Sequence, residues 1–515
     1  MMKIFTNFFV LLVIFTVFAS ESVQSQDQSL KNKKVLKWAA DIESGAPYAF
    51  GHPDNLDSLV GFEVDIIKAI AEELGMEQEH VQNQWDGLIP GLNIGNYDVA
   101  INGLEITSDR QQVVNFSDPY YISYEQIVVR KDVETISNLS DLVGKKVGTL
   151  KGCLAERILR ATGGIDVRTY DSEKNSYTDL ENGRLEAVLI DQPVAMYYAG
   201  WNPQLKITGQ PIGNFTYGIA INKSDTLLLK KVNQAIMNLK TSGKLREILE
   251  RWKLWNFMMA NELKDESVSN VQHSGYDMYI KSQTKEITIS DRIYRYISFL
   301  PMFGQAALIT VGLSVVAMLV AILLGLFLAL VRVYAPKPFS SLAIAFIEIV
   351  RGTPLLIQLY FIYYALPEIF PSLSLSPFVA AIIGLGCNYA AYEAENYRAG
   401  ISSVPKGQME AAISLGMKKF QALRYVILPQ AIRVVIPPIT NDFISLLKDS
   451  SLVSVITMVE LTKVYGLLAA TYYDYIGTGI MVAAIYLLIG LPFVKLSKVA
   501  EKKFSPENKN NGNKK

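Results

Sequence analysis

The feature that most constrains this chain is a series of long apolar runs in its second half. Residues 302–331 carry no charge, and a helix needs about 20 apolar residues to cross a bilayer. Four further runs follow at 342–366, 377–392, 428–459 and 475–494, although Asp442, Lys448 and Asp449 interrupt the third of these. The runs predict an all-α five-helix transmembrane domain over residues 300–498.

Basic residues indicate which side of the membrane each loop faces. If the first span starts outside, the loops at 332–341 and 398–433 and the tail after residue 494 face the cytoplasm, and they hold 15 Lys and Arg residues. The opposite loops, at 367–376 and 459–474, hold one. Because cytoplasmic loops are enriched in Lys and Arg, we expect a multi-pass protein of the cell (inner or plasma) membrane. Its N-terminal part lies outside the cytoplasm and residues 499–515 form a cytoplasmic tail.

The N-terminus is typical of an exported protein. Lys3 precedes an apolar run at 4–19 that is short for a bilayer span, and small residues follow it. This pattern predicts a signal peptide over residues 1–26, either cleaved or retained as an anchor.

The overall charge and the scarcity of metal-binding residues exclude several classes of protein. The chain has 49 Lys and Arg against 49 Asp and Glu, which argues against nucleic-acid binding. Two cysteines and three scattered histidines provide neither a disulfide framework nor a metal site, and we expect no cofactor.

Residues 33–255 have the pattern of a soluble α/β domain. Short apolar strands alternate with helical patterns, as in open sheets with parallel strands, and the length suits two lobes. The expected strands are 35–40, 98–102, 126–130, 146–149, 187–190 and 218–221, and the expected helices are 63–74, 154–161 and 227–239. Residues 256–299 are expected to comprise a polar linker and most of an interfacial helix at 291–303.

Two segments of this domain repeat one layout, in which a strand is followed by a polar turn and the start of a helix. Arg110 ends the first segment, and Asp191 follows the strand of the second, where Pro193 opens a helix. Ligands of open α/β sheets bind beyond the carboxyl ends of strands, so Arg110 and Asp191 would face a cleft between two lobes. Together they fit the carboxylate and ammonium of an amino acid. Alternatively, Asp191 only caps a helix and Arg110 is a solvated helix-start residue.

The same domain resembles the polar amino-acid periplasmic binding proteins, which include those for histidine, for lysine/arginine/ornithine and for glutamine. The matching stretches are 97–121, which ends in Asn-Phe-Ser-Asp-Pro-Tyr-Tyr, 85–92, 142–148, 182–193 and 232–252. The resemblance implies an α/β two-lobe clamshell of the type II periplasmic binding protein fold. Lobe one would comprise about 33–128 and 216–253, and lobe two about 131–213.

The resemblance also implies roles for individual residues. Arg110 would bind the α-carboxylate of the substrate, and Asp191 would bind its α-ammonium. Trp85 would flank the substrate side chain. The other residues implied at the site are Asp41, Gly103 and Thr107.

Two positions depart from the family pattern. Glu105 stands where a hydroxyl residue is usual, and Cys153 and Leu154 replace another hydroxyl position, so that only backbone N–H groups remain there. A carboxylate at position 105 would bind the ammonium more strongly or accept from a cationic side chain. Because Asp41, Glu105 and Asp191 place three carboxylates near one site, we expect a basic amino acid such as arginine, lysine, ornithine or histidine. Glutamine is the alternative.

The membrane half resembles the permeases of ABC importers for polar amino acids. Residues 403–417 match the Glu-Ala-Ala loop, which in that family forms a short helix that docks on the ATPase subunit. Further matches at 351–354, 391–398, 428–430 and 448–452 extend the resemblance over about residues 300–500. The implied ATPase-coupling residues are Gly407, Glu410, Ala411, Ala412 and Gly416.

These observations predict a transporter subunit rather than an enzyme. The sequence contains no phosphate-binding Gly-x-x-x-x-Gly-Lys-Ser/Thr loop, so we expect a separate ATPase subunit, in two copies. Five spans are few for an enclosed path, so we expect the permease domain to form a homodimer. Three rivals fit less well. A ligand-gated channel has no use for the Glu-Ala-Ala loop, a clamshell lyase needs a catalytic domain, and a sensor needs a large cytoplasmic output domain.

Overall fold

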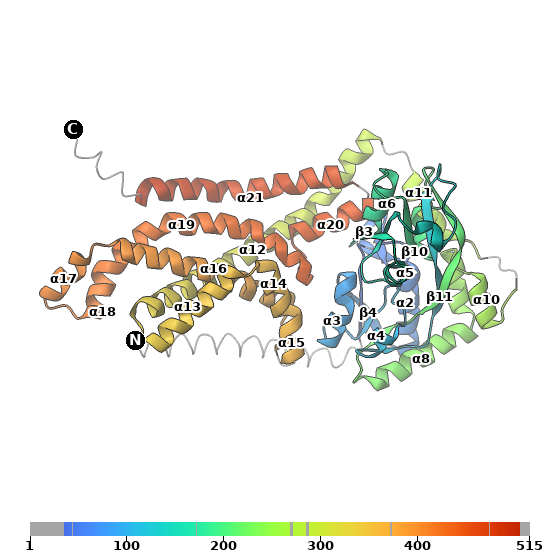
Figure 1. The fold of residues 1–515 in the computed structure, drawn as a ribbon, viewed down its shortest axis with the longest axis horizontal. Helices are drawn as coiled ribbons and strands as arrows, with labels where there is room; N and C mark the ends of the chain where they lie inside the picture. Colours follow the sequence, from blue (N-terminus) through green and yellow to red (C-terminus); the bar gives the residue numbers. More distant parts are fainter. Residues whose placement is uncertain are drawn as a thin grey trace. The chain divides into compact units, whose positions relative to one another are not determined.

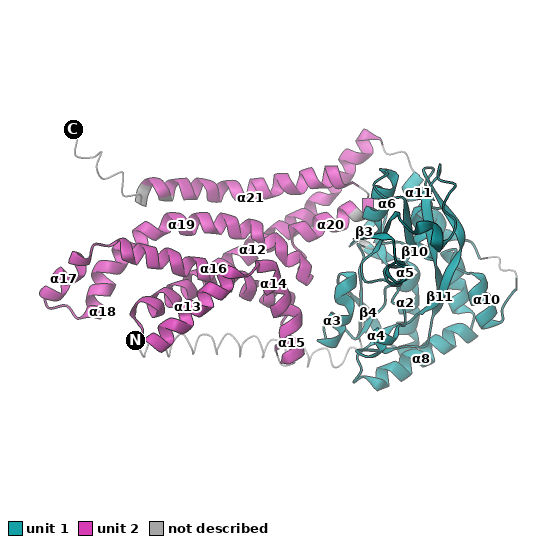
Figure 2. Cartoon of the chain, in the orientation of Figure 1, with its two compact units in different colours: residues 1–285 teal, residues 286–515 magenta. Residues whose placement is uncertain are grey.

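The computed structural model describes residues 35–504 except 44, 171, 268–270, 285–287, 371–372 and 473. The expected signal peptide (1–26) and the last residues of the expected tail (505–515) lie outside the described residues. The chain divides into two compact units, residues 1–285 and residues 286–515 (Figure 2). Each unit has hydrophobic clusters of its own.

The first unit contains a sheet with the strand order β4-β1-β5-β12-β6, of which the edge strand β4 is labelled in Figure 1. Its strands are β1 (Val35–Ala40), β4 (Glu77–Gln82), β5 (Val99–Ala100), β6 (Asn115–Phe116) and β12 (Ala220–Ile221). β1 pairs in parallel with β4 and β5, whereas β12 runs antiparallel to β5 and β6. Trp38 and Ala39 point to opposite faces of β1 and join different hydrophobic clusters, so this strand is covered on both sides.

The part of the unit that carries this sheet is called the first lobe. Its remaining elements are the hairpin β2 (Phe50–His52) and β3 (Asn55–Val60), and the helices α2 (Phe62–Leu74), η1 (Trp85–Gly87), α3 (Leu88–Asn93), α4 (Ser108–Gln111), α8 (Thr226–Thr241) and α9 (Lys244–Arg251).

A second sheet, with the strand order β11-β7-β10-β8-β9, defines the second lobe. Its strands are β7 (Tyr121–Arg130), β8 (Lys146–Leu150), β9 (Asp166–Tyr170), β10 (Ala187–Asp191) and β11 (Leu205–Tyr217). Its helices are η2 (Leu139–Leu142), α5 (Leu154–Thr162), α6 (Glu173–Glu181) and α7 (Gln192–Tyr198). The chain enters this lobe through β7 and returns through the antiparallel β11, so these two strands connect the lobes.

The two sheets confirm the α/β fold predicted from the sequence. Each expected strand and helix of residues 33–255 overlaps an element of the structure, although β5 and β12 are only two residues long. Their positions were predictable because short apolar runs between turn residues are characteristic of buried strands.

The segment expected to be a linker, residues 256–299, is different in the structure. It contains the helices α10 (Phe257–Leu263) and α11 (Ser274–Thr284) and the start of a long helix, α12 (Ile289–Tyr334). The Tyr279 ring lies 5.7 Å from the Phe50 ring and 5.0 Å from the Tyr197 ring, and only 3% of Tyr279 is exposed. A few apolar side chains therefore hold this polar segment on the first unit. The expected interfacial helix at 291–303 is the beginning of α12, which Thr288 caps.

The second unit is helical. After α12 it comprises α13 (Lys337–Gly352), α14 (Leu355–Tyr360), η3 (Phe361–Ala365), α15 (Leu366–Ile369), α16 (Pro377–Ser403), α17 (Lys406–Ser414), α18 (Lys419–Ala422), η5 (Leu423–Ile427), α19 (Leu428–Asp449), η6 (Ser450–Ile456), α20 (Leu461–Tyr472) and α21 (Tyr475–Phe504). Within the described residues, three helical stretches are long and apolar enough to cross a membrane: Ile289–Tyr334, Lys419–Ile456 and Tyr475–Val499.

Two of the five expected spans differ from uninterrupted apolar helices. The run at 342–366 is divided between α13 and α14–α15, which meet at an angle of 109° and together make a fourth candidate span. Pro354 lies at this break, where a proline cannot continue the preceding helix. The run at 377–392 lies within α16, which is not among the candidate spans, and its buried Asn388 and Glu393 lower its apolar character.

One buried carboxyl group ties α2 to the turn that precedes α4. Glu63 is fully buried, and one of its oxygens accepts hydrogen bonds from the Gly103 N–H at 2.8 Å and from the Tyr120 hydroxyl. Burial raises the pKa of Glu63 from 4.5 to about 8. The folded protein therefore keeps this proton at neutral pH, whereas the unfolded chain releases it above about pH 4.5.

We therefore predict that Glu63→Gln reduces the pH dependence of stability. Protonated Glu63 contributes to the free energy of unfolding. This contribution is fully present below pH 4.5 and is lost as the pH rises through about 8. Each unit of difference between the folded and unfolded pKa corresponds to about 1.36 kcal/mol. The melting temperature of the wild type should fall more steeply than that of Glu63→Gln between pH 5 and 8. All five tryptophans lie in the first unit, so tryptophan fluorescence of the full chain reports its melting.

The exposed Glu72, on the same helix, provides the matched control. Glu72→Gln should leave the wild-type slope unchanged. Parallel pH profiles for the wild type and Glu63→Gln would contradict the assignment of a retained proton to Glu63.

Candidate functional site

A small pocket lies between the two lobes of the first unit. The first lobe lines it with Tyr48, Trp85, Asn102, Gly103 and Glu105. The second lobe lines it with Leu150, Cys153, Glu173, Ile190, Asp191 and Val194. Three of these side chains are carboxylates and none is a Lys or Arg, so this lining suits a small organic cation.

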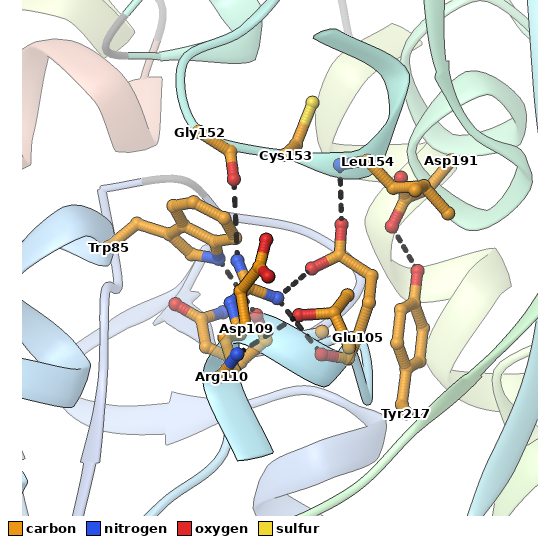
Figure 3. A network of polar contacts seen from close by, with 12 residues as sticks. Trp85, Glu105, Asp109, Arg110, Gly152, Cys153, Leu154, Asp191 and Tyr217 are labelled. Atoms are coloured by element: carbon orange, nitrogen blue, oxygen red, sulfur yellow. Dashed lines mark hydrogen bonds and ion pairs between the residues drawn. The ribbon is translucent and has the colours of Figure 1, made fainter. Parts of the chain in front are cut away.

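At the edge of the pocket, one carboxylate joins the two lobes (Figure 3). Glu105 accepts from the Arg110 guanidinium with one oxygen and from the Leu154 N–H with the other, at 3.0 Å. Arg110 also donates to the carbonyl oxygens of Glu105, at 3.1 Å, and of Gly152, at 3.4 Å. The Leu154 N–H is free to do this because the first N–H groups of a helix, here α5, have no partner within it.

Trp85 is held in place by polar contacts behind the pocket. Its indole N–H donates to the Asn102 carbonyl oxygen at 3.1 Å, and the Arg110 guanidinium carbon lies 4.9 Å from its ring centre. The Asp41 carboxylate accepts from the backbone N–H groups of Trp85 and Glu43, each at 3.0 Å. Asp41 therefore positions Trp85 from behind and does not line the pocket.

Asp191 ends β10 and faces the pocket from the second lobe. One of its oxygens accepts from the Tyr48 hydroxyl at 3.2 Å and from the Tyr217 hydroxyl. Burial and the nearby charge of Glu105 raise the pKa of Asp191 to about 7, although the two tyrosine donors oppose this shift. Asp191 can therefore bind an ammonium group as a carboxylate, and its charge is poised near neutral pH.

Two further buried carboxyl groups of the second lobe lie at or near the pocket. Glu125 on β7 is the strand partner of Asp191 and is fully buried. Burial and the charge of Asp191 raise the pKa of Glu125 well above its usual value. Burial likewise raises the pKa of Glu173, a lining residue at the start of α6, to about 8. Glu173 therefore retains its proton at neutral pH because it is buried.

The structure brings together most of the residues predicted for the substrate site. Trp85, Gly103, Glu105 and Asp191 line the pocket, whereas Arg110 and Leu154 reach it through Glu105. Thr107 is the N-cap of α4, and its hydroxyl accepts from the Arg110 N–H at 3.4 Å. The Gly103 N–H donates to Glu63, so in this structure it points away from the pocket.

The sequence reasoning missed Tyr48, Glu125, Glu173 and Tyr217. Glu125 had a detectable signal, because a carboxylate inside an otherwise apolar strand needs a partner or a proton. The tyrosines had none, because Tyr48 and Tyr217 are far apart in the chain and converge on Asp191 only after both lobes fold.

No group of three or more His, Cys, Asp or Glu side chains that could hold a metal ion occurs among the described residues. Cys153 is buried in the pocket wall, where its thiol donates to the Leu150 carbonyl oxygen at 3.0 Å.

In the second unit, the predicted coupling residues lie on or next to the short helix α17. Gly407, Glu410 and Ala411 are exposed, whereas Ala412 is buried on the opposite side of the helix. Gly416 has φ +86°, a left-handed conformation that ends the helix and turns the chain toward α18. An exposed helix with small residues on its surface is thus available for close packing against another protein.

Several ionisable residues of the second unit are paired with one another. Asn396 donates to Asp442 at 2.8 Å and to Glu393 at 3.3 Å, which links α16 to α19. Arg332 of α12 pairs with Glu395 of α16.

Two family models match the chain. Bacterial extracellular solute-binding proteins, family 3, match residues 38–254. The binding-protein-dependent transport system inner membrane component matches residues 321–506. The two matches fall on the two structural units in turn.

Each of the following relatives matches less than half of the chain. The L-cystine-binding protein of Escherichia coli (strain K12) is 38% identical over 209 residues, which are 40% of this chain and 78% of that protein. The glutamine transport system permease protein of the same strain is 36% identical over 192 residues, 37% of this chain and 88% of that protein. Its ABC transporter arginine-binding protein 1 is 32% identical over 202 residues, 38% of this chain and 82% of that protein.

We predict that Arg110→Lys weakens amino-acid binding about 10- to 100-fold while the first unit stays folded. Lysine keeps a positive charge beside Glu105 but lacks the planar fork that binds a carboxylate with two hydrogen bonds. Isothermal titration calorimetry on the full chain in detergent measures the affinity, and tryptophan fluorescence measures the melting temperature.

Arg157→Lys is the matched control, because Arg157 lies on α5 and pairs with the exposed Asp109 at 3.3 Å. This control should bind the amino acid like the wild type. Wild-type affinity in Arg110→Lys would show that the carboxylate of the amino acid does not bind Arg110.

Proposed function

The chain belongs to the polar amino-acid ABC importers, and we propose that it is a combined substrate-binding and permease subunit that takes up basic amino acids. It joins an α/β binding domain to an inner-membrane permease domain, which in its named relatives are separate proteins. We propose the class of amino acid that it binds, the side of the membrane on which it binds it, and the protein subunits with which it assembles.

The observation that carries the substrate assignment is the acidic composition of the pocket lining. Glu105, Glu173 and Asp191 line it, with no Lys or Arg among the lining residues. A basic amino acid brings two positive groups and one negative group, and so supplies the cations that this lining lacks. Tyr48 and Trp85 add aromatic faces, which attract cations. The arginine-binding relative supports this assignment, and the glutamine and cystine relatives define the alternatives.

We propose that the α-carboxylate of the substrate binds Arg110 and the Leu154 N–H, and that its α-ammonium binds Asp191. A guanidinium and the N-terminus of a helix both favour a carboxylate. In this arrangement Trp85 flanks the substrate side chain, and Asp41 and Thr107 act indirectly, by positioning Trp85 and Arg110.

The proposed route is inward across the cell membrane. The excess of Lys and Arg in the loops at 332–341 and 398–433 and in the tail supports a binding domain outside the cytoplasm. A separate ATPase, in two copies, would dock on α17, whose neighbour Leu415 is 82% exposed. We further propose that the permease domain pairs with a second copy of itself to enclose the path.

A ligand screen tests the substrate assignment. The melting of the full chain in detergent is followed by tryptophan fluorescence in the presence of each of the twenty amino acids, ornithine or cystine. A ligand at 100 times its dissociation constant should stabilise the first unit by about 2.7 kcal/mol. We expect the largest shifts with arginine, lysine, ornithine or histidine. A shift with glutamine alone or cystine alone would establish that alternative, and no shift with any of them would contradict the proposal.

A further inference from the structure

Glu105 occupies the place that a ligand carboxylate would take. Its two oxygens accept from the Arg110 guanidinium in the first lobe and the Leu154 N–H in the second (Figure 3). These are the two donors assigned above to the α-carboxylate of the substrate. Glu105 itself is only 1% exposed, so solvent cannot replace either donor. Glu105 alone therefore satisfies both donors.

The same contact closes the cleft. Leu154 and Glu105 belong to different lobes, so their hydrogen bond breaks when the lobes separate. Two other hydrogen bonds also cross between the lobes: the Tyr48 hydroxyl donates to Asp191 at 3.2 Å inside the pocket, and Arg110 donates to the Gly152 carbonyl oxygen at 3.4 Å.

Two ion pairs at this edge are exposed or long. Arg157 and Asp109 form an exposed ion pair at 3.3 Å, and Lys151 and Asp86 are 3.9 Å apart. Exposed pairs contribute little to stability, whereas a buried charged hydrogen bond contributes more.

We propose that Glu105 is an internal ligand: its carboxylate holds the empty cleft closed and must be displaced by the α-carboxylate of the incoming amino acid. This inference rests on the proposed function for the identity of the displacing ligand. The closing contact itself involves only Glu105, Arg110 and Leu154.

Displacement makes Glu105 a selector of the substrate side chain. Once the substrate carboxylate binds Arg110, Glu105 loses its cation, while Asp191 takes the α-ammonium. Glu105 then lies in a pocket whose other ionisable lining groups are Asp191, Glu173, Tyr48 and the buried Cys153, and none of these is a cation. A neutral substrate such as glutamine would leave Glu105 buried without a partner, which is strongly unfavourable. The side-chain cation of a basic amino acid supplies that partner.

The proteins that this domain resembles usually have a hydroxyl residue at this position, and such a residue could not hold the cleft closed as Glu105 does. A hydroxyl group is too short and carries no charge, so it cannot join Arg110 to Leu154 as Glu105 does. Such a site would leave both donors open to the ligand and would not require a second cation. Glu105→Ser therefore converts the site to the pattern of the proteins it resembles, and Glu105→Gln removes the charge while preserving the shape.

The first test measures the empty cleft and needs no ligand. Spin labels on the exposed Gln112, in the first lobe, and Ala161, in the second, report the distance between lobes by double electron–electron resonance. The labels are carried by Gln112→Cys and Ala161→Cys in a Cys387→Ser background, which leaves the buried Cys153 in place. We expect one short distance in the wild type, and a second, longer one in Glu105→Gln and Glu105→Ser.

Asp109→Asn is the matched control, because it breaks an ion pair between the same two lobes without touching the pocket. It should keep the short distance. An open empty wild type, or Glu105 variants as closed as the wild type, would overturn the proposal that Glu105 holds the cleft.

The second test compares arginine with citrulline, which has the same shape but a neutral urea group. Calorimetry on the full chain should give the wild type at least about 100-fold preference for arginine, the size expected for leaving a buried carboxylate unpaired. In Glu105→Gln and Glu105→Ser the preference should fall below about tenfold, because citrulline binding improves. An unchanged preference in both variants would overturn the selector role.

The two tests separate this inference from the proposed function. If the wild type bound no amino acid at all, the proposed function would fail, while the distances in the empty protein would still decide whether Glu105 closes the cleft. If the wild type bound arginine and citrulline equally, the proposed capture of amino acids would stand and the selector role would be wrong.

Discussion

The pairing of buried charge is the constraint on which the binding cleft depends. Arg110 is the cation at its edge, and the carboxyl groups of Glu105, Glu125, Glu173 and Asp191 lie around it. An isolated charge in such an interior is costly, so each group needs a partner or a proton. Arg110 pairs with Glu105, Asp191 accepts from two tyrosines, and burial keeps protons on the other two carboxyl groups. When a ligand binds, its charged groups replace some of these partners, and every buried charged group must still have a partner or a proton.

This exchange links the architecture to transport. The partners come from both lobes, so changing them changes whether the cleft is open or closed, which is the signal that a permease can respond to. Because the two domains are covalently joined, the connecting segment sets the effective concentration of one domain for the other. The helices α10 and α11 of this segment belong to the fold of the binding domain, because they pack on it.

The sequence predicted the regular parts of this molecule well and the exceptions poorly. β1, β10 and α5 were found because burial imposes a simple apolar period. The helices α10 and α11 of the linker segment were not predicted, because Tyr279 is one of few buried residues in a stretch of polar composition. The bend near Pro354 divides one apolar run between two helices, and Asn388 and Glu393 lower the apolar character of the continuous helix α16. At the site, the layout located Arg110 and Asp191, but the contact of Glu105 with the other lobe depends on tertiary structure that no local pattern contains.

The most direct measurement of the central claim is an experimental structure of the full chain with arginine bound. The account predicts that the arginine α-carboxylate takes the place of the Glu105 carboxylate on Arg110 and the Leu154 N–H. Glu105 should then contact the guanidinium of the bound arginine, with the α-ammonium on Asp191. A structure in which arginine fills the pocket while Glu105 still accepts from both Arg110 and Leu154 would contradict the exchange of partners on which the account rests.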